Sequence, residues 1–168
     1  ESLYSIGIFR IDGMLLTHPA VDHINGAALL AGRMPRGETY GIADTDVLIT
    51  QRTEITFADC KLTVFPGLTS GTDNEKSLSV LFQPGKRAIL ITGDRTVAGE
   101  NALVAAWLPN LDYLVVGHHG SDTSTGETLL SATRPLCAVI SVGANNRYGH
   151  PDQTVLDRLA AYGCTVLR

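Results

Sequence analysis

The order of the predicted elements constrains the fold most strongly, because hairpins come first and strands alternating with helices follow. The hairpin strands are short runs separated by turn residues, at 54–57 with 61–65 and at 77–82 with 88–92. The later strands are apolar runs at 113–116, 137–142 and 165–167. The helices around them are predicted at 97–108, 126–133 and 154–162. This order favours an α/β (α+β mixed) chain with a mixed sheet covered by helices.

The N-terminal third contributes one strand and one helix to this pattern. The apolar run 11–17 predicts a buried strand, and 23–31 predicts a short helix that ends near Gly32. The segment 67–76 is polar and long enough to form a loop over a site. No repeat or linker interrupts the sequence, so residues 1–168 are expected to form a single domain.

Composition excludes several classes of protein. Of the 168 residues, 44% are hydrophobic and 18% charged, which suits one folded domain. The net charge of −4 argues against a broad basic face for nucleic acid, and 6% aromatic residues do not favour an aromatic stacking platform. No run approaches 18 apolar residues. The three cysteines are odd in number and lack CxxC spacing, so we expect small buried side chains rather than a disulfide framework.

The five histidines fall in three short motifs, each of which follows a predicted strand or strand–loop segment. The motifs are Thr17-His18-Pro19-Ala20-Val21-Asp22-His23, Val116-Gly117-His118-His119-Gly120-Ser121 and Tyr148-Gly149-His150-Pro151. Asp94 follows another apolar strand in Ile91-Thr92-Gly93-Asp94. Since loops at strand ends gather ligands in such folds, and imidazole and carboxylate ligate zinc, manganese or iron, the pattern predicts a metal site.

Each motif also has a purely structural interpretation. Asp22 and Asp94 can act as helix N-caps. His118 and His119 can be one buried and one exposed histidine, because neighbours at a strand end point in opposite directions. His150 can be a surface residue in a turn. The joint placement of all five histidines beside strand ends favours the functional interpretation.

The residues resemble the metallo-β-lactamase superfamily, and more narrowly the C-terminal metallo-β-lactamase-like domain of ComEC-type DNA-internalisation (competence) proteins. The segments that carry the resemblance are LLTHPAVDHING (15–26), TDNEKSLSVL (72–81), ILITGD (89–94), LVVGHHGS (114–121), Thr123-Ser124 and PLCAVISVGANNRYGHP (135–151). The resemblance implies an αββα sandwich. The family's DVGQGD-like opening segment is absent, so the chain is expected to be an N-terminally truncated piece of a larger protein, without the first strands of the sandwich.

The resemblance also implies the roles of individual residues. The metal ligands would be His18, Asp22, His23, Asp94 and His150, holding one or two divalent ions, zinc or manganese. Asp22, His118 and His119 would be catalytic, and Asn74, Ser77 and Ser121 would lie at the substrate. Ala20 stands where the superfamily has a second histidine and this branch often has aspartate. Because a methyl group ligates nothing, the site is expected to hold a single ion, to bind metal weakly, or to recruit another residue.

The function implied by the resemblance is metal-dependent hydrolysis of DNA that degrades the non-transported strand during natural competence. Its partners would be single-stranded DNA as substrate and the membrane channel part of the same polypeptide, with a homo-oligomer as a further option and no small-molecule cofactor. The domain would belong to a bacterial inner-membrane protein and face the extracytoplasmic side. The alternatives are a catalytically degenerate structural or gating domain and a superfamily hydrolase of small esters or lactams.

Overall fold

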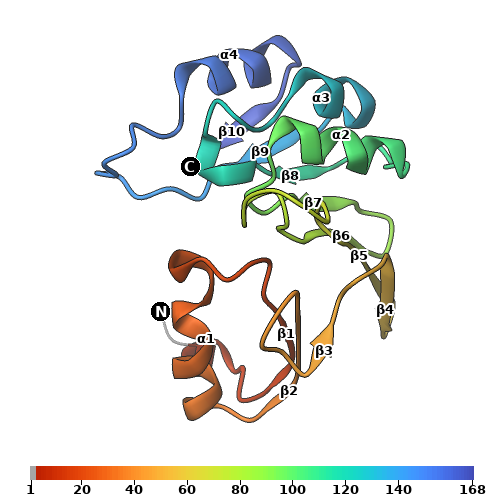
Figure 1. Ribbon diagram of the computed structural model, residues 1–168, viewed down its shortest axis with the longest axis vertical. Coiled ribbons are helices and arrows are strands. Elements are labelled where there is room, and N and C mark those ends of the chain that lie inside the picture. Colours follow the sequence, from red (N-terminus) through yellow and green to blue (C-terminus); the bar gives the residue numbers. More distant parts are fainter. Residues whose placement is uncertain (1–2) are drawn as a thin grey trace.

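The computed structural model describes residues 3–168 and contains two sheets with helices on their outer sides (Figure 1). The small sheet is parallel and has the order β1 (Ile11–Leu15), β2 (Arg36–Gly41), β3 (Val47–Leu48). Helix α1 (Val21–Arg33) joins β1 to β2, as a crossover between parallel strands requires. The 3-10 turn η1 (Leu3–Ile6) precedes this unit.

The large sheet has seven strands in the order β10-β9-β8-β7-β6-β5-β4. The antiparallel half comprises β4 (Thr53–Phe57), β5 (Cys60–Phe65), β6 (Ser79–Pro84) and β7 (Ile89–Ile91). The parallel half adds β8 (Tyr113–Val115), β9 (Cys137–Val139) and β10 (Thr165–Leu167). Its helices are α2 (Val97–Ala105), α3 (Glu127–Thr133) and α4 (Gln153–Ala161), and Figure 1 shows them together above this sheet.

Two hydrophobic clusters hold these layers together. One lies beneath α2, α3 and α4 and includes the fully buried Leu90, Leu114 and Leu159. The other joins the two sheets, where Val64 and Leu78 pack with Leu15 and other apolar side chains. The predicted α/β sandwich of helix, sheet, sheet and helix is therefore confirmed.

The strands and helices expected from sequence periodicity are present, with shifted ends. The strand predicted at 11–17 is β1, but the prediction that it is buried was wrong, because all five of its residues are half-buried or exposed. Helix α1 begins two residues before the predicted start of 23 and ends two residues after the predicted end of 31. Helix α2 ends at Ala105, earlier than predicted, and Trp107 has a φ of 64°, outside the helical range. Pro84-Gly85 forms the predicted turn, in which Arg87 N donates to the Pro84 carbonyl oxygen.

Strands β2 and β3 were not predicted from sequence, because glycine and charged residues in 36–41 disfavour a strand assignment. The structure gives a packing reason for one of these glycines. A Cβ atom at Gly37 would lie 1.9 Å from the Asp12 carbonyl oxygen of the neighbouring strand, so only glycine fits there. Gly37 therefore lowers the strand propensity of this segment but allows β1 and β2 to pair.

Asp46 connects the β2–β3 turn to β2 and should make the small sheet sensitive to acid. Its Oδ2 accepts hydrogen bonds from Thr39 N (2.8 Å), Thr39 Oγ1 (2.7 Å) and Arg36 NH1 (3.1 Å). These bonds, the backbone bond first, lower the pKa of Asp46 from 3.8 to about 2. A lowered carboxylate pKa stabilises the fold above about pH 4, and this contribution is lost as the pH falls towards 2.

We therefore expect Asp46→Asn to destabilise the chain at neutral pH and to lose part of the acid dependence. Urea denaturation at several pH values between 6 and 2 measures this. The difference in unfolding free energy between wild type and variant should shrink between pH 4 and 2. A difference that stays constant over this range would contradict the prediction.

Candidate metal centre

Four segments that are far apart in the sequence converge at one edge of the molecule. Parallel strands β7, β8 and β9 end at the same edge of the large sheet, and their loops carry Asp94, the histidine pair and His150. The fourth segment follows β1, and Leu78 N donates to the Thr17 carbonyl oxygen (2.9 Å) to hold it against the large sheet. The cleft of about 230 Å³ between them is lined by Ala20, Asp22, Asn74, Asp94, His118, His119, Tyr148 and His150.

Asp94 is the buried acid around which two histidines gather. Its carboxylate lies with Oδ1 3.3 Å from His23 Nε2 and Oδ2 3.7 Å from His18 Nε2. The centroids of the two imidazole rings are 4.2 Å apart. His18 is 1% exposed and Asp94 5% exposed, so their mutual arrangement is fixed by the surrounding protein.

The electrostatics of this cluster suit a bound cation. Burial lowers the pKa of His18, and the neighbouring His23 lowers it further. The nearby Asp94 carboxylate raises the pKa of His23. Burial alone would raise the pKa of Asp94, but the nearby His23 imidazole, with smaller contributions from other histidines, lowers it overall. An ionised carboxylate beside a neutral imidazole is a metal-ligating pair.

Two groups of possible metal ligands share His23. The first is His18, His23 and Asp94, and the second is Asp22, His23 and His119. In the second group, His119 Nε2 lies 3.4 Å and His23 Nε2 3.9 Å from Asp22 Oδ2. In both groups the possible ligand atoms lie within 4.8 Å of one another, which is close enough to hold one ion. The lone pair of His23 Nε2 can bind only one ion at a time. His23 can therefore ligate an ion in either group, but not one in each group at once.

The polar atoms that face this cluster are poorly satisfied by the protein. Within the described residues, the Nε2 atoms of His18, His23 and His119 are buried without a hydrogen-bond partner. His119 Nδ1 donates to the Ser141 carbonyl oxygen (2.8 Å), which leaves Nε2 facing the Asp22 carboxylate. Buried polar atoms without partners are costly, and a cation between them removes the cost. The residues present therefore fit a divalent metal.

Hydroxyl groups behind the cluster hold its rings in place. Thr17 Oγ1 lies 3.1 Å from His18 Nδ1 and 3.3 Å from His23 Nδ1, on the side away from Asp94. Ser77 is buried, and its Oγ lies 3.4 Å from His18 Nδ1 while accepting from Asp94 N (3.2 Å). Ser77 thus lies beneath the cluster rather than in the cleft.

A tight turn brings both neighbouring histidines into the cleft. His118 and His119 have φ values of 48° and 55°, in the left-handed region that non-glycine residues seldom adopt. Because of this turn, the two rings do not point to opposite faces as they would on a strand. His118 Nε2 lies 3.3 Å from Asn74 Nδ2 and its Nδ1 3.3 Å from Thr123 Oγ1, so the loop predicted to cover a site does reach this turn.

Not all of the site residues predicted from sequence belong to the two donor groups. His150 lines the cleft, with its ring centroid 6.0 Å from that of His118, but it belongs to neither donor group. Ser121 is buried in its own loop, where its Oγ contacts Thr123 Oγ1 at 3.0 Å. Asp22 and Asp94 do not cap helices. The N-cap of α1 is Ala20 and that of α2 is Thr96, and neither makes a side-chain capping hydrogen bond.

Sequence reasoning missed several residues that build the site. Thr17 and Thr123 contact histidine rings, and Tyr148 lines the cleft beside His150. The position of Thr17 directly before His18 is a weak signal, since hydroxyl residues are common next to turns. Tyr148 lies in a motif that drew attention only for its histidine.

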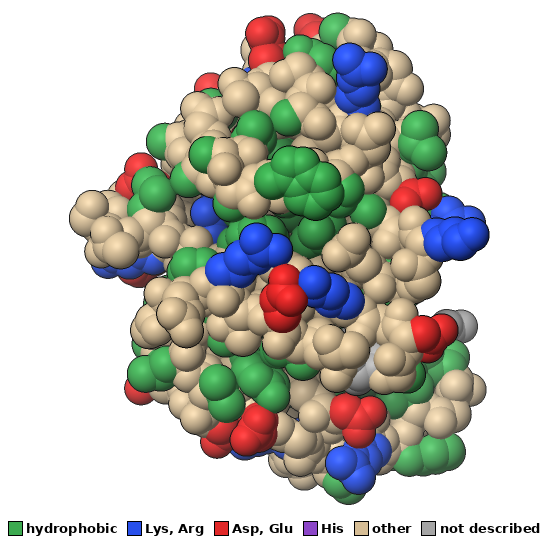
Figure 2. Space-filling view, turned by 90° about the vertical axis from the view of Figure 1, so that its right-hand side faces the viewer, with side chains coloured by type: hydrophobic (Ala, Val, Ile, Leu, Met, Phe, Trp, Pro, Cys, Tyr) green, Lys and Arg blue, Asp and Glu red, His purple; other side chains and the backbone are tan. Residues whose placement is uncertain are grey.

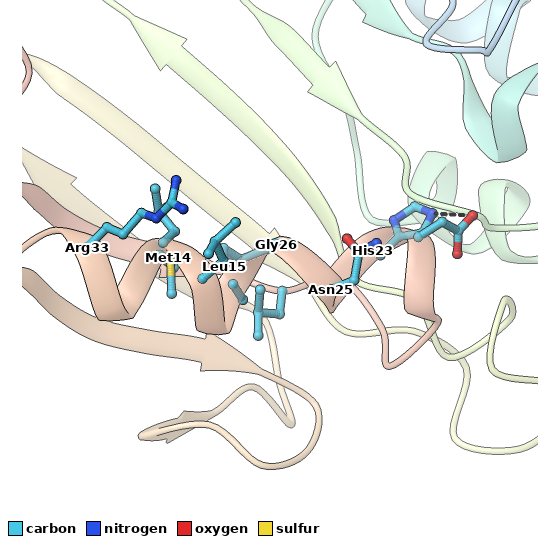
Figure 3. A pocket seen from close by; sticks show the side chains of 11 residues that line it. Met14, Leu15, His23, Asn25, Gly26 and Arg33 are labelled. Carbon is cyan, nitrogen blue, oxygen red and sulfur yellow. Dashed lines mark ion pairs between the residues drawn. The ribbon is translucent and has the colours of Figure 1, made fainter. Parts of the chain in front are cut away.

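A larger hollow adjoins the centre but adds no ligands to it. It has a volume of about 520 Å³ and runs between α1 and β1. Figure 3 shows His23 at one end of α1 and Arg33 at the other, with Met14 and Leu15 between them. The lining between these ends is mostly apolar, so the metal-ligating side chains are confined to the His23 end.

Sequence comparison relates the chain to competence proteins. It is 34% identical over 174 residues to competence protein ComA of Neisseria gonorrhoeae, covering 99% of this chain and 25% of that protein. It is 33% identical over 185 residues to ComE operon protein 3 of Bacillus subtilis, covering 96% and 24%. The resemblance to ComEC-type competence proteins is confirmed. The chain spans about a quarter of the length of these ComEC-type relatives, and no family model matches it.

Solved structures confirm the fold of this ComEC-type chain. CmlA, a diiron β-hydroxylase from Streptomyces venezuelae, matches with a TM-score of 0.70 at 14% identity, covering 98% of this chain and 45% of that one. The metallo-β-lactamase fold protein YhfI from Bacillus subtilis matches with a TM-score of 0.62 at 13% identity, covering 93% and 73%. Zn²⁺-bound PqqB from Methylobacterium extorquens matches with a TM-score of 0.57 at 16% identity, covering 94% and 71%. These likenesses show the metallo-β-lactamase fold.

Among residues 3–168, no helix combines the length and the apolar character that a bilayer crossing requires.

Proposed function

We propose that the chain is a metal-dependent phosphodiesterase domain that hydrolyses DNA and degrades the non-transported strand during competence. One observation carries the proposal: three buried imidazole nitrogens without hydrogen-bond partners gather around two carboxylates at the cleft. His18, His23 and Asp94 would hold one divalent cation, zinc or manganese. When bound, such a cation supplies Lewis-acid chemistry that makes water nucleophilic at neutral pH and offsets negative charge on a phosphate.

The other cleft residues would handle protons and position the substrate. The Asp22 side chain is 64% exposed and opens to the cleft, so it can accept a proton from the attacking water. His119 faces Asp22 and can stabilise charge that develops on the phosphate. Both ring nitrogens of His118 have partners, which suits a role in holding Asn74 over the cleft.

The contact with DNA has to be local. Figure 2 shows acidic and basic side chains intermingled on one face of the molecule, with no histidine visible there. The net charge of −4 also gives no long-range attraction for phosphates. We therefore place the DNA contact at the cleft itself, and expect binding that is weak for the isolated chain and sensitive to salt.

Cleavage assays with three substrates test the proposal. A single-stranded oligodeoxynucleotide, bis-p-nitrophenyl phosphate and a lactam would be incubated with the chain and Mn²⁺ or Zn²⁺, with Asp94→Ala as the control. We expect cleavage of both phosphodiesters, and loss of that cleavage in the variant and in the presence of a chelator. Failure to cleave any phosphodiester with any divalent metal would overturn the proposal. Faster cleavage of the lactam would favour the small-substrate alternative.

A second candidate rests on Ala20. Its methyl group lines the cleft in place of a ligand, which favours a catalytically degenerate domain with a structural or gating role in the DNA channel. Calorimetric titration with Mn²⁺ and Zn²⁺ separates the candidates, since the degenerate domain would bind neither ion.

We also propose how this chain fits into a larger protein. The membrane channel would lie in the part of the ComEC-type relatives that this chain does not cover. The chain itself would lie on the extracytoplasmic side of the bacterial inner membrane.

Thr17 offers a test of how the ligands are oriented. A hydroxyl oxygen can accept from both Nδ1–H groups, which would leave the two Nε2 lone pairs directed at the metal. We expect Thr17→Val to weaken metal binding about 10- to 100-fold, the cost typical of losing such a supporting bond, while Thr17→Ser retains it. Competition with a chromophoric chelator measures the affinities. Equal affinities for the valine and serine variants would contradict this role.

A further inference from the structure

One exposed aromatic side chain stands directly at the cleft. Tyr148 is 67% exposed and lines the cleft together with Asp22, Asp94 and His119. It lies in the loop between β9 and α4, residues 140–152, which extends at the left of Figure 1. A large apolar ring left in solvent beside reactive groups is a candidate binding surface.

Two side chains, His150 and Arg147, lie next to the exposed Tyr148 ring, and the three together are called the stack. The Tyr148 ring lies 5.9 Å from that of His150, with an interplanar angle of 20°. The guanidinium carbon of Arg147 lies over the tyrosine ring at 4.9 Å, and Arg147 NH2 donates to the Tyr148 hydroxyl (2.7 Å). Within residues 3–168, Arg147 has no carboxylate partner, so its positive charge is available to a ligand.

The loop that presents this stack is held by one asparagine. Asn146 Nδ2 donates to the His150 carbonyl oxygen (2.6 Å) and to the Gly143 carbonyl oxygen (3.1 Å). Asn146 Oδ1 accepts from Tyr148 N (3.1 Å) and His150 N (3.0 Å). All four hydrogen-bonding contacts come from one side chain, so the stack is organised before any ligand binds.

The base and the phosphate of a nucleotide suit the tyrosine ring and the arginine, respectively. Nucleobases stack on aromatic side chains, and arginine contacts phosphates while it also stacks. A base inside a duplex has no free face, so such a surface selects a strand whose bases are unpaired. A small ester or lactam would use neither the ring nor the guanidinium in this way.

We infer that Tyr148, supported by His150 and Arg147, is a nucleobase-stacking subsite that positions an unpaired nucleotide next to the metal centre. The inference rests on the proposed function and adds the residues that distinguish single strands from duplexes. It also revises the expectation from the low aromatic content, because a single well-placed ring suffices where an extended platform is absent.

Binding of oligonucleotides to the chain without added metal tests the subsite separately from catalysis. The probes are a fluorescein-labelled thymidine octamer, the same octamer with abasic residues, and a duplex of equal length, followed by anisotropy. Wild type should bind the single strand best. Tyr148→Ala should lose about tenfold in affinity for the thymidine octamer and change little for the abasic strand. Tyr148→Phe, which keeps the ring, should stay within about twofold of wild type.

The outcomes separate the subsite from the proposed function. Equal affinities of wild type and Tyr148→Ala for the thymidine octamer, or equal affinities of wild type for thymidine and abasic strands, would overturn the subsite even if the metal-loaded chain cleaves DNA. Tyr148-dependent binding without cleavage under any divalent metal would support the subsite and overturn the nuclease. Absence of both binding and cleavage would overturn both.

Discussion

Replacing His23 by alanine is expected to weaken metal binding about 100-fold or more. Both groups of donor atoms, His18-His23-Asp94 and Asp22-His23-His119, include His23 Nε2, so its loss leaves two donors in each. Loss of a supporting second-sphere bond typically costs 10- to 100-fold in metal affinity, and loss of a direct ligand should cost about 100-fold or more. Calorimetric titration of wild type and His23→Ala with Mn²⁺ and Zn²⁺ measures the change.

His150→Ala is the matched control for this prediction. His150 also lines the cleft, but it is in neither donor group, so its removal should lower metal affinity much less. Circular dichroism melting of both variants shows whether the fold is retained. Metal binding by His23→Ala with wild-type affinity would contradict the shared-ligand arrangement, and a larger loss in His150→Ala would move the metal to the His150 side of the cleft.

The second large effect concerns Glu100, which is buried and belongs to neither donor group. Its two carboxylate oxygens accept hydrogen bonds from Thr125 N (2.7 Å) and Gly126 N (2.8 Å), at the start of α3. Burial raises the pKa of Glu100, while these bonds and nearby arginines oppose the rise. Truncation to alanine leaves both buried N–H groups without an acceptor, and we expect it to cost about 3 kcal/mol in unfolding free energy.

Glu100→Gln separates the loss of charge from the loss of acceptors. Glutamine keeps one acceptor oxygen but turns an NH₂ group towards the other N–H, so its stability should lie between wild type and Glu100→Ala. Urea denaturation of the three proteins gives the order. An alanine variant within about 0.5 kcal/mol of wild type would show that the two bonds contribute little.

The Glu100 contacts also bear on the site. The carboxylate anchors the segment that precedes α3, and Arg158 NH1 donates to the Ser124 (3.0 Å) and Thr125 (2.7 Å) carbonyl oxygens in the same segment. Thr123 of this segment contacts His118 Nδ1. Loss of Glu100 should therefore loosen the histidine turn as well as the fold.

The strand and helix order could be predicted from sequence because it depends on local periodicity. The alternating runs 54–57 and 61–65 pair as β4 and β5, and the apolar runs after residue 110 form parallel strands. Strand β2 could not be predicted, since Gly37 is selected by the close approach of Asp12 in another strand. The end of α2 before Trp107 is likewise set by a backbone conformation that the sequence pattern does not contain.

The general location of the candidate site could be predicted from sequence, but its detailed contacts could not. Histidines placed after strands indicated a convergent site because strand ends meet at one edge of a sheet. The finer contacts depend on distances between loops. Nothing in the sequence shows that Thr17 faces two imidazole rings, that Ser121 turns into its own loop, or that Asn146 presents Tyr148 to the cleft.

Anomalous diffraction from crystals of the chain grown with Mn²⁺ would locate the ion itself. We expect an anomalous peak bonded to the His23 and His18 imidazoles and the Asp94 carboxylate at the cleft. A fully loaded crystal with no peak among these three side chains, or with its peak at a site that excludes His23, would contradict the proposed metal centre.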